Sequence, residues 1–264
     1  MNIRLAIATL AISSVALAAS PPWLATLTKN PPGDFSELRS LRAVYHFGWS
    51  GLTAATGEAH FNQVSPDRFQ MDAAGRTIGL ARALWRYDVT YKAIDNGRNL
   101  MPIETNQDEV FRAKKVRTHL TFASTGVTRA RTDGNTATTS KDFIFPRVLS
   151  LSAAMLYLRS QPLHENDVYR VVVYPTTSPY LATLTVTGHE KIALRPGAYQ
   201  TIKMDLQLSK VGKNLELEPH KKFRKATIWL SDDAERLPVR IEAQIFAGTI
   251  FAELQSLQFD QARP

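Results

Sequence analysis

The chain has 264 residues, a formal net charge of +8 and no cysteine. The absence of cysteine excludes disulfide bonds, thiolate zinc sites, iron–sulfur clusters and cysteine nucleophiles. A chain of this length can bury a substantial core without cross-links, either as one large β domain or as two smaller ones. No segment after the first 18 residues has the apolar length of a membrane-spanning helix.

Residues 1–18 have the three-part layout of a secretory signal peptide. Arg4 belongs to a short polar opening, residues 5–17 are almost entirely apolar or small, and Ala16-Leu17-Ala18 has small residues where a signal peptidase reads them. We therefore expect export to the periplasm, with a mature chain that starts near Ala19. An uncleaved N-terminal anchor is the alternative. No cysteine follows the apolar run, which excludes a lipid-anchored lipoprotein.

Residues 19–40 predict a proline-rich tether in front of the folded domain. Pro21-Pro22 and Pro31-Pro32-Gly33 resist both helices and central strands. We expect this segment to be loosely packed and residues 41–264 to form a single β domain.

That domain is dominated by short β-branched and aromatic runs that end at turn residues, which is the pattern of β-strands. The runs are 44–49, 58–61, 69–73, 89–94, 116–122, 127–131, 169–174, 181–188, 199–208, 225–230, 239–246 and 249–259. Segments 78–86 and 151–159 instead have helical spacing, and the polar stretch 133–142 is expected to be a loop. The pattern predicts a mainly β fold, namely a large curved antiparallel sheet or an open (incomplete) β-barrel with two short helices. A β-sandwich is the alternative.

The usual catalytic motifs are missing from the sequence. There is no phosphate-binding P-loop and no G-x-G-x-x-G, and the Gly48-Trp49-Ser50-Gly51 stretch is one residue too short for a nucleophile elbow. The six histidines are scattered and none has metal-ligand spacing. A hydrolase would have to assemble its site in space, and the acid and histidine candidates for it are Glu58, His60, Asp232 and Asp233. We expect no catalytic residue, no metal and no cofactor.

The strongest local pattern is the polar turn within residues 228–239. Asp232 and Asp233 could hold a cation or act as paired carboxylates. Turn chemistry explains the same residues, because Asp and Ser side chains bond their own backbone in turns. Arg236 is also close enough in sequence to neutralise one of the aspartates.

Two segments are strongly basic. Residues 110–132 contain no acid, and residues 219–225 are equally cationic. Such segments attract anionic lipid surfaces or polyanions, although a solvated basic face that aids solubility is the simpler reading. Nucleic acid is not expected, because aromatics do not interleave with these cations as stacking platforms and the chain is exported. The candidates for contact with an anionic surface are Arg112, Lys114, Lys115, Arg117, Lys221, Lys222 and Arg224.

The stretch from Trp229 to Ile241 resembles the closing hairpin of the bacterial family DUF3108, and other segments resemble that family in the same order. These are Gly57-Glu58-Ala59, Asp88-Val89-Thr90-Tyr91, Leu100-Met101-Pro102 and residues 149–159, although the usual Asp-Pro opening of the last is displaced or lost. The resemblance runs from about Leu41 to Phe259. It implies an exported envelope protein with a large curved sheet, similar to open-barrel carriers of lipids or lipoproteins, and it implies no catalytic residue.

A curved sheet partly covered by the two helices would leave an apolar trough on its concave face, which we expect to bind a lipid-like ligand. The candidates to line the trough are Trp49, Phe61, Trp85, Leu156, Tyr157 and Trp229, and the alternative for each is ordinary core packing. The expected partner is a lipid or an anionic envelope polymer. Two other functions stay open: binding of an envelope protein at exposed strand edges, and hydrolysis of envelope polymers.

Overall fold

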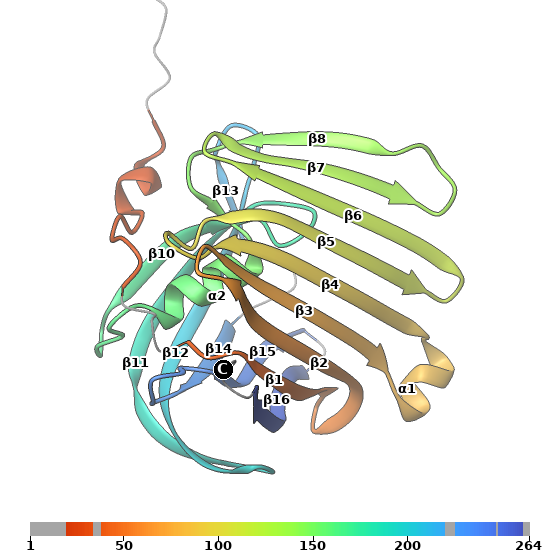
Figure 1. The fold of residues 1–264 in the computed structure, drawn as a ribbon, viewed down its shortest axis with the longest axis vertical. Coiled ribbons are helices and arrows are strands. Elements are labelled where there is room, and N and C mark those ends of the chain that lie inside the picture. The colour runs from red at the N-terminus through yellow and green to blue at the C-terminus, as the bar shows by residue number, and fades with distance from the viewer. Residues whose placement is uncertain (1–19, 34–37, 220–224, 247, 261–264) are drawn as a thin grey trace, which may run out of the picture.

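The computed structural model describes residues 20–33, 38–219, 225–246 and 248–260, and the predicted signal peptide lies outside them. These residues form one large sheet and two α-helices (Figure 1). The first eight strands are β1 (Leu41–Trp49), β2 (Leu52–Ser65), β3 (Arg68–Thr77), β4 (Tyr87–Asn96), β5 (Pro102–Phe111), β6 (Lys114–Ala123), β7 (Gly126–Asp133) and β8 (Thr139–Ile144). The others are β9 (Val148–Leu149), β10 (Val168–Val173), β11 (Tyr180–Leu194), β12 (Gly197–Val211), β13 (Leu217–Pro219), β14 (Lys225–Ser231), β15 (Pro238–Ile245) and β16 (Gly248–Phe259).

The strand order makes this sheet an open barrel. From one end to the other it runs β8-β7-β6-β5-β4-β3-β2-β1-β16-β15-β14-β12-β11-β10-β9, with β13 paired to β12. The last strand, β16, pairs with β1 and so joins the two halves of the chain, whereas β8 and β9 do not pair with each other. All pairs are antiparallel except β9 with β10. The predicted mainly β fold with an incomplete barrel and two short helices is thus confirmed.

Side chains bridge part of the seam between the two ends of the sheet. The guanidinium of Arg129 on β7 donates to the carbonyl oxygen of Thr177 at 3.1 Å. Next to it, the Thr176 hydroxyl donates to the Gln107 side chain at 3.0 Å. These contacts link β5 and β7 to the connection between β10 and β11. Side chains thus join the two ends of the sheet, although β8 and β9 do not pair as strands.

Alternation along the strands decides which side chains face inward. On β6, Val116, Thr118 and Leu120 are buried, while the residues between them point outward. Partners in register share a face, so an inward position on one strand continues onto its neighbours. The register therefore identifies the residues of each strand whose side chains lie on the concave face.

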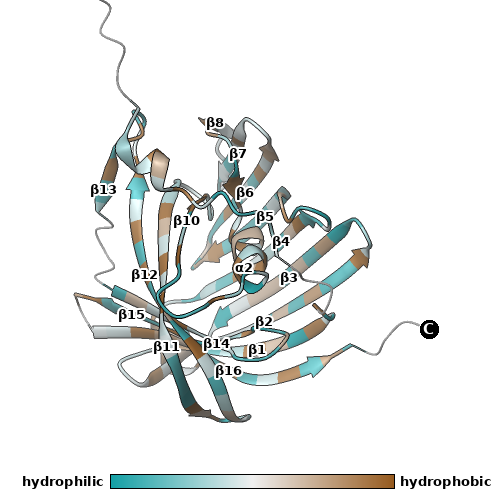
Figure 2. Cartoon of the chain, turned by 90° about the vertical axis from the view of Figure 1, so that its left-hand side faces the viewer, coloured by the Kyte–Doolittle hydropathy of each residue, from teal (hydrophilic) through white to brown (hydrophobic). Residues whose placement is uncertain are grey.

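The helix α2 (Leu151–Arg159) lies on this concave face, between the two halves of the sheet (Figure 2). Its alanines, leucines and methionine favour a helix, and the Ser150 hydroxyl caps it by accepting from the Ala153 amide at 3.0 Å. Tyr157 and Leu158 pack into the core formed with β10, β11, β12 and β14, and Leu156 packs into the core under β1–β3 and β16. The predicted helix over 151–159 is confirmed.

The helix α1 (Gly79–Leu84) also forms within the predicted segment, but its position differs from the expectation. It buries none of its residues and lies at one rim of the sheet, in the connection between β3 and β4 (Figure 1). Leu80 and Leu84 are exposed to solvent. The expectation that this helix covers the trough is therefore wrong.

Part of the proline-rich N-terminal segment is packed against the sheet. Residues Pro22–Thr26 form a 3-10 helix, η1. Trp23 stacks on Phe145 with ring centroids 5.8 Å apart, and its indole N–H donates to the Leu215 carbonyl at 2.8 Å. The expectation of loose packing is therefore wrong for this part, because an apolar tryptophan follows the prolines and finds a buried aromatic neighbour. None of the helices in the described part of the chain is long and apolar enough to cross a membrane.

Candidate ligand-binding site

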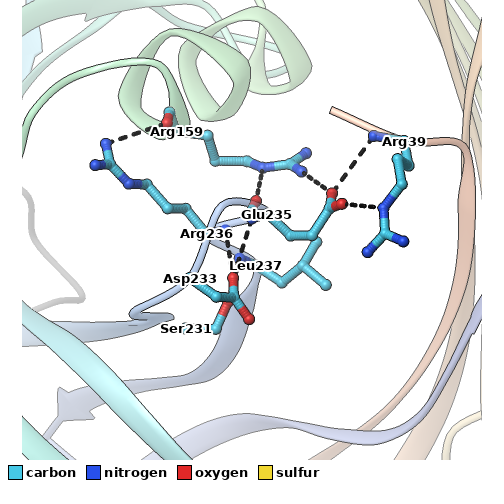
Figure 3. A network of polar contacts seen from close by, with 7 residues as sticks. All are labelled: Arg39, Arg159, Ser231, Asp233, Glu235, Arg236 and Leu237. Carbon is cyan, nitrogen blue, oxygen red and sulfur yellow. Dashed lines mark hydrogen bonds and ion pairs between the residues drawn. The ribbon is translucent and has the colours of Figure 1, made fainter. Parts of the chain in front are cut away.

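The polar turn between β14 and β15 satisfies its own backbone and does not form an open carboxylate site. One carboxylate oxygen of Asp233 accepts from the amides of Glu235 and Arg236, each at 3.0 Å, and from the Ser231 hydroxyl at 2.7 Å (Figure 3). The Ser231 hydroxyl in turn accepts from the Leu237 amide at 2.8 Å. The hydrogen bonds that Asp233 accepts within the turn therefore explain why an aspartate stands at this position.

This turn presents Glu235 to the C-terminal end of α2, where both partners are buried. The Arg159 guanidinium donates from Nε to the Glu235 carbonyl at 2.8 Å, and its Nη2 lies 3.7 Å from the Glu235 carboxylate (Figure 3). The same carboxylate accepts from Arg39 Nε at 2.5 Å. Burial lowers the pKa of Arg159 to about 10, and the neighbouring Glu235 opposes that shift. We call Arg39, Arg159 and Glu235 the latch.

The N-terminal end of α2 is fastened to β4 through a second buried group. The carboxylate of Asp95 accepts from the Ser150 hydroxyl at 3.2 Å and from the Ser152 hydroxyl at 2.5 Å. Burial raises the pKa of Asp95 from 3.8 to about 6, and the two serine hydrogen bonds oppose this rise. With the latch at its other end, α2 is held at both ends against opposite parts of the sheet.

Between α2 and the inner face of β10, β11, β12 and β14 lies a pocket of about 300 Å³, which we call the α2 pocket. No charged side chain lines it. Leu151 belongs to its lining and is half exposed, so solvent reaches this side of the pocket. Further members of the lining are Ala154, Met155, Val171, Ala182, Leu206 and Leu208.

The register explains why this wall is continuous and apolar. Val171 pairs with Ala182, which pairs with Leu208, so one row of apolar side chains crosses three strands on the same face. The sequence analysis predicted these strands and the helix, but not this wall. The period-2 apolar positions in segments 169–174, 181–188 and 199–208 are the signal that could have identified it.

A second hollow lies on the inner face of β1–β4, and we call it the alanine–glycine trough. Its volume is about 290 Å³. Gly57 pairs with Gly75 and Ala59 with Ala73, so small residues cover the middle of this face. A side chain at position 57 would collide with the Phe47 ring, since a Cβ there would lie 2.8 Å from it. The aromatic members of the lining are Tyr45, Phe47, Tyr87 and Tyr91.

The six residues predicted to line the trough fall into three environments. Tyr157 lines the α2 pocket. Phe61, Leu156 and Trp229 are buried in the core cluster under β1–β3 and β16. Trp49 and Trp85 are largely exposed and lie outside both hollows.

Trp229 belongs to the same core cluster as Phe61 and Leu156, and its indole ring also contacts polar groups. Its indole N–H donates to the Glu190 carboxylate, and the Lys203 ammonium and the Arg240 guanidinium lie 5.5 and 5.8 Å from its ring centre. Cations over the face of an indole ring are a stabilising arrangement. This residue of the family-like hairpin is therefore not part of either hollow.

Four of the predicted basic contacts lie on the β5–β6 hairpin and are exposed. Two of them are near acids, because Lys114 is 3.5 Å from Asp133 and Arg117 is 3.8 Å from Asp108. Arg112 and Lys115 have no ion pair within the described residues. The remaining three, Lys221, Lys222 and Arg224, lie outside the described residues.

The four candidates for a hydrolytic site do not hydrogen-bond to one another in the described structure. His60 contacts Asp260 at 2.8 Å, Glu58 lies 4.0 Å from Arg42, and the carboxylate of Asp232 lies 3.8 Å from His189. Asp233 is held in its turn. No group of three or more metal-ligating side chains occurs in the described residues.

The fold is similar to that of a solved β-barrel-like protein. A β-barrel-like protein of the domain of unknown function DUF1849 from Brucella abortus superposes with a TM-score of 0.61 at 11% identity, over 85% of this chain and 99% of that one. A candidate lipoprotein from Parabacteroides distasonis gives 0.38 at 9% identity (87% and 100% covered), and a candidate exported protein from Bacteroides fragilis gives 0.32 at 9% identity (86% and 97% covered). No curated protein matches the chain. The family described as "Protein of unknown function (DUF3108)" matches residues 43–255.

Proposed function

Starting from the fact that this chain belongs to the DUF3108 family, we propose that it is a non-catalytic cell-envelope protein that binds a lipid-like ligand on the concave face of its open barrel. The α2 pocket is the observation that carries the proposal. It combines an uncharged lining, access to solvent and a wall whose helix is fastened at both ends. The N-terminal sequence, with the layout of a signal peptide, supports a location in the envelope.

An acyl chain fits the chemistry of this pocket. Each methylene group that leaves water for an apolar wall contributes about 0.8 kcal/mol, and no polar contact is needed for that gain. The volume of about 300 Å³ is at the lower end of the range for small-molecule sites, about 300–1,000 Å³. The alanine–glycine trough is a second hollow on the same face of the sheet.

Filling the pocket with a larger side chain tests this proposal. Ala182 lies in the lining, so Ala182→Phe is expected to weaken binding of a fluorescent fatty acid at least tenfold, measured by titration and by displacement with oleate. Thr183→Phe is the matched control, because the next residue on β11 faces the opposite side. We expect its affinity to stay within twofold of the original chain.

The folded state of both variants is checked by circular dichroism and by the urea midpoint. If Ala182→Phe does not fold, Ala154→Phe fills the same pocket from α2. Equal fatty-acid affinity in the original chain and in a folded pocket-filled variant would remove the basis of the proposal, as would the absence of any binding by the original chain.

Partner binding at a strand edge is the weaker candidate. The strand β8 is an end of the sheet and has one edge unpaired in the described structure. However, it has only six residues and carries Lys141 and Asp142, and short charged edges are the arrangement that natural sheets use against edge-to-edge pairing.

A further inference from the structure

One rim of the sheet carries a group of large apolar side chains in water. They come from the β1–β2 turn, from α1 and its C-terminal end, and from the β15–β16 turn. These connections are neighbours, because the sheet order β4-β3-β2-β1-β16-β15 brings the same ends of these strands together (Figure 1). We call this group the apolar rim, and its members, between 47% and 86% exposed, are Trp49, Leu52, Leu80, Leu84, Trp85 and Phe246.

The backbone holds these connections in place. The Ser50 amide donates to the Thr249 carbonyl at 2.7 Å and so joins the β1–β2 turn to the start of β16. The Ile78 amide donates to the Ala54 carbonyl at 2.9 Å, which joins the start of α1 to β2. The rim is therefore a defined surface, and its exposed apolar side chains need an explanation.

Positive charge flanks the apolar rim. The Arg112 amide donates to the Arg86 carbonyl at 2.8 Å, which places the basic β5–β6 turn directly beside the end of α1. The acids at this edge have partners: Asp88 is contacted by Arg82 at 2.7 Å and by Arg86 at 3.4 Å, Asp133 lies 3.5 Å from Lys114, and Glu109 accepts from the Tyr87 hydroxyl at 2.7 Å. Arg112 and Lys115 are exposed at the same edge. The surface thus combines exposed tryptophan and leucine with an excess of cations.

The apolar rim is continuous with the alanine–glycine trough. Phe47 lines the trough and lies two residues before Trp49, and Tyr87 lines it two residues after Trp85. A molecule that leaves a surface in contact with the rim would therefore meet the aromatic end of the trough first. The passage of a ligand from the rim to the trough rests on the proposed function, because it matters only in a protein that binds lipids.

We infer that the apolar rim docks on an anionic phospholipid membrane. Tryptophan and leucine enter the boundary between headgroups and acyl chains, where tryptophan is enriched in membrane proteins. Arg86, Arg112 and Lys115 lie against the lipid phosphates. Charge complementarity selects a membrane over a second copy of this chain, since two copies would bring the same cations together.

Vesicle co-sedimentation tests the inference. The purified protein is expected to bind vesicles of equal parts phosphatidylcholine and phosphatidylglycerol, and to bind pure phosphatidylcholine at least fivefold more weakly. The double variant Leu80→Gln/Leu84→Gln is expected to lose at least tenfold in affinity for the anionic vesicles, and Arg112→Glu/Lys115→Glu to lose most of the preference for them. Ile144→Gln is the matched control, because Ile144 is as exposed as the leucines but lies on β8.

Two outcomes would overturn the inference: no sedimentation with anionic vesicles, or equal losses in the rim variant and in Ile144→Gln. Self-association through the rim without vesicle binding would identify a second copy as the occupant and would also overturn it. Fatty-acid titration on the same variants separates this inference from the proposed function. Intact fatty-acid binding without vesicle binding contradicts the membrane inference alone, whereas vesicle binding without fatty-acid binding contradicts the proposed function.

Discussion

Replacing Glu235 with alanine is expected to lower the free energy of unfolding by about 3–5 kcal/mol, because it leaves a buried cation without its carboxylate. The side chains of Arg159 and Glu235 are only 5% and 7% exposed, so water cannot take over the role of the missing group. The bond from Arg39 is lost as well. Urea denaturation, followed by tryptophan fluorescence, measures the change.

Asp232→Ala is the control for this experiment, since Asp232 lies in the same turn and its side chain is 44% exposed. We expect its effect to stay within about 0.5 kcal/mol. If Glu235→Ala changed stability no more than this control, the latch would not hold α2 against the sheet.

Replacing Asp95 with asparagine is expected to change the pH dependence of stability. The pKa of Asp95 rises from 3.8 to about 6 on folding, so between these values the folded state binds more protons than the unfolded chain. The contribution of this carboxyl to stability is therefore most favourable below about pH 4 and declines as the pH rises to about 6. A difference of roughly two units between the pKa values of the folded and unfolded states corresponds to about 3 kcal/mol in the free energy of unfolding.

Asparagine has no charge to lose, so Asp95→Asn should gain about 3 kcal/mol relative to the original chain between pH 4 and pH 7. Urea unfolding of both proteins at the two pH values measures this difference. A stability difference that is the same at both pH values would show that the buried carboxyl does not titrate with a raised pKa.

Local patterns were sufficient for much of the fold. Runs of β-branched and aromatic residues marked most strands, and the alanine- and leucine-rich segment 151–159 marked α2. The strand β8 was missed within a segment taken as a loop, because its residues are mostly polar and exposed and it has no buried face to leave a pattern. The role of α1 was misjudged because helical spacing does not say what a helix packs against.

Less of the candidate site than of the fold could be predicted from the sequence. Large aromatics were chosen as trough residues, whereas the hollows are bounded largely by small and aliphatic residues that leave space unfilled. Gly57 and Ala59 on one strand, with Ala73 and Gly75 on the next, form a period-2 pattern that could have predicted the trough once the strands were paired. The exposed tryptophans 49 and 85 instead belong to the rim, and only the strand order shows that they lie at one edge.

The family-like hairpin has a structural role in this chain. Its acidic turn is held by Asp233, and this geometry places Glu235 against Arg159 of the helix that the same family resemblance identified. Two separated segments of the family pattern therefore meet in the latch. The contact gives the acidic turn and the arginine at the end of the helix a shared structural role.

Photo-crosslinking with a diazirine-labelled fatty acid, followed by peptide mapping, tests ligand binding in the α2 pocket most directly. The account predicts light-dependent labels on α2 and on the facing residues of β10–β12, all of which disappear when excess oleate competes. Labelling only of outward-facing or unrelated peptides, or labelling that oleate does not reduce, would contradict it.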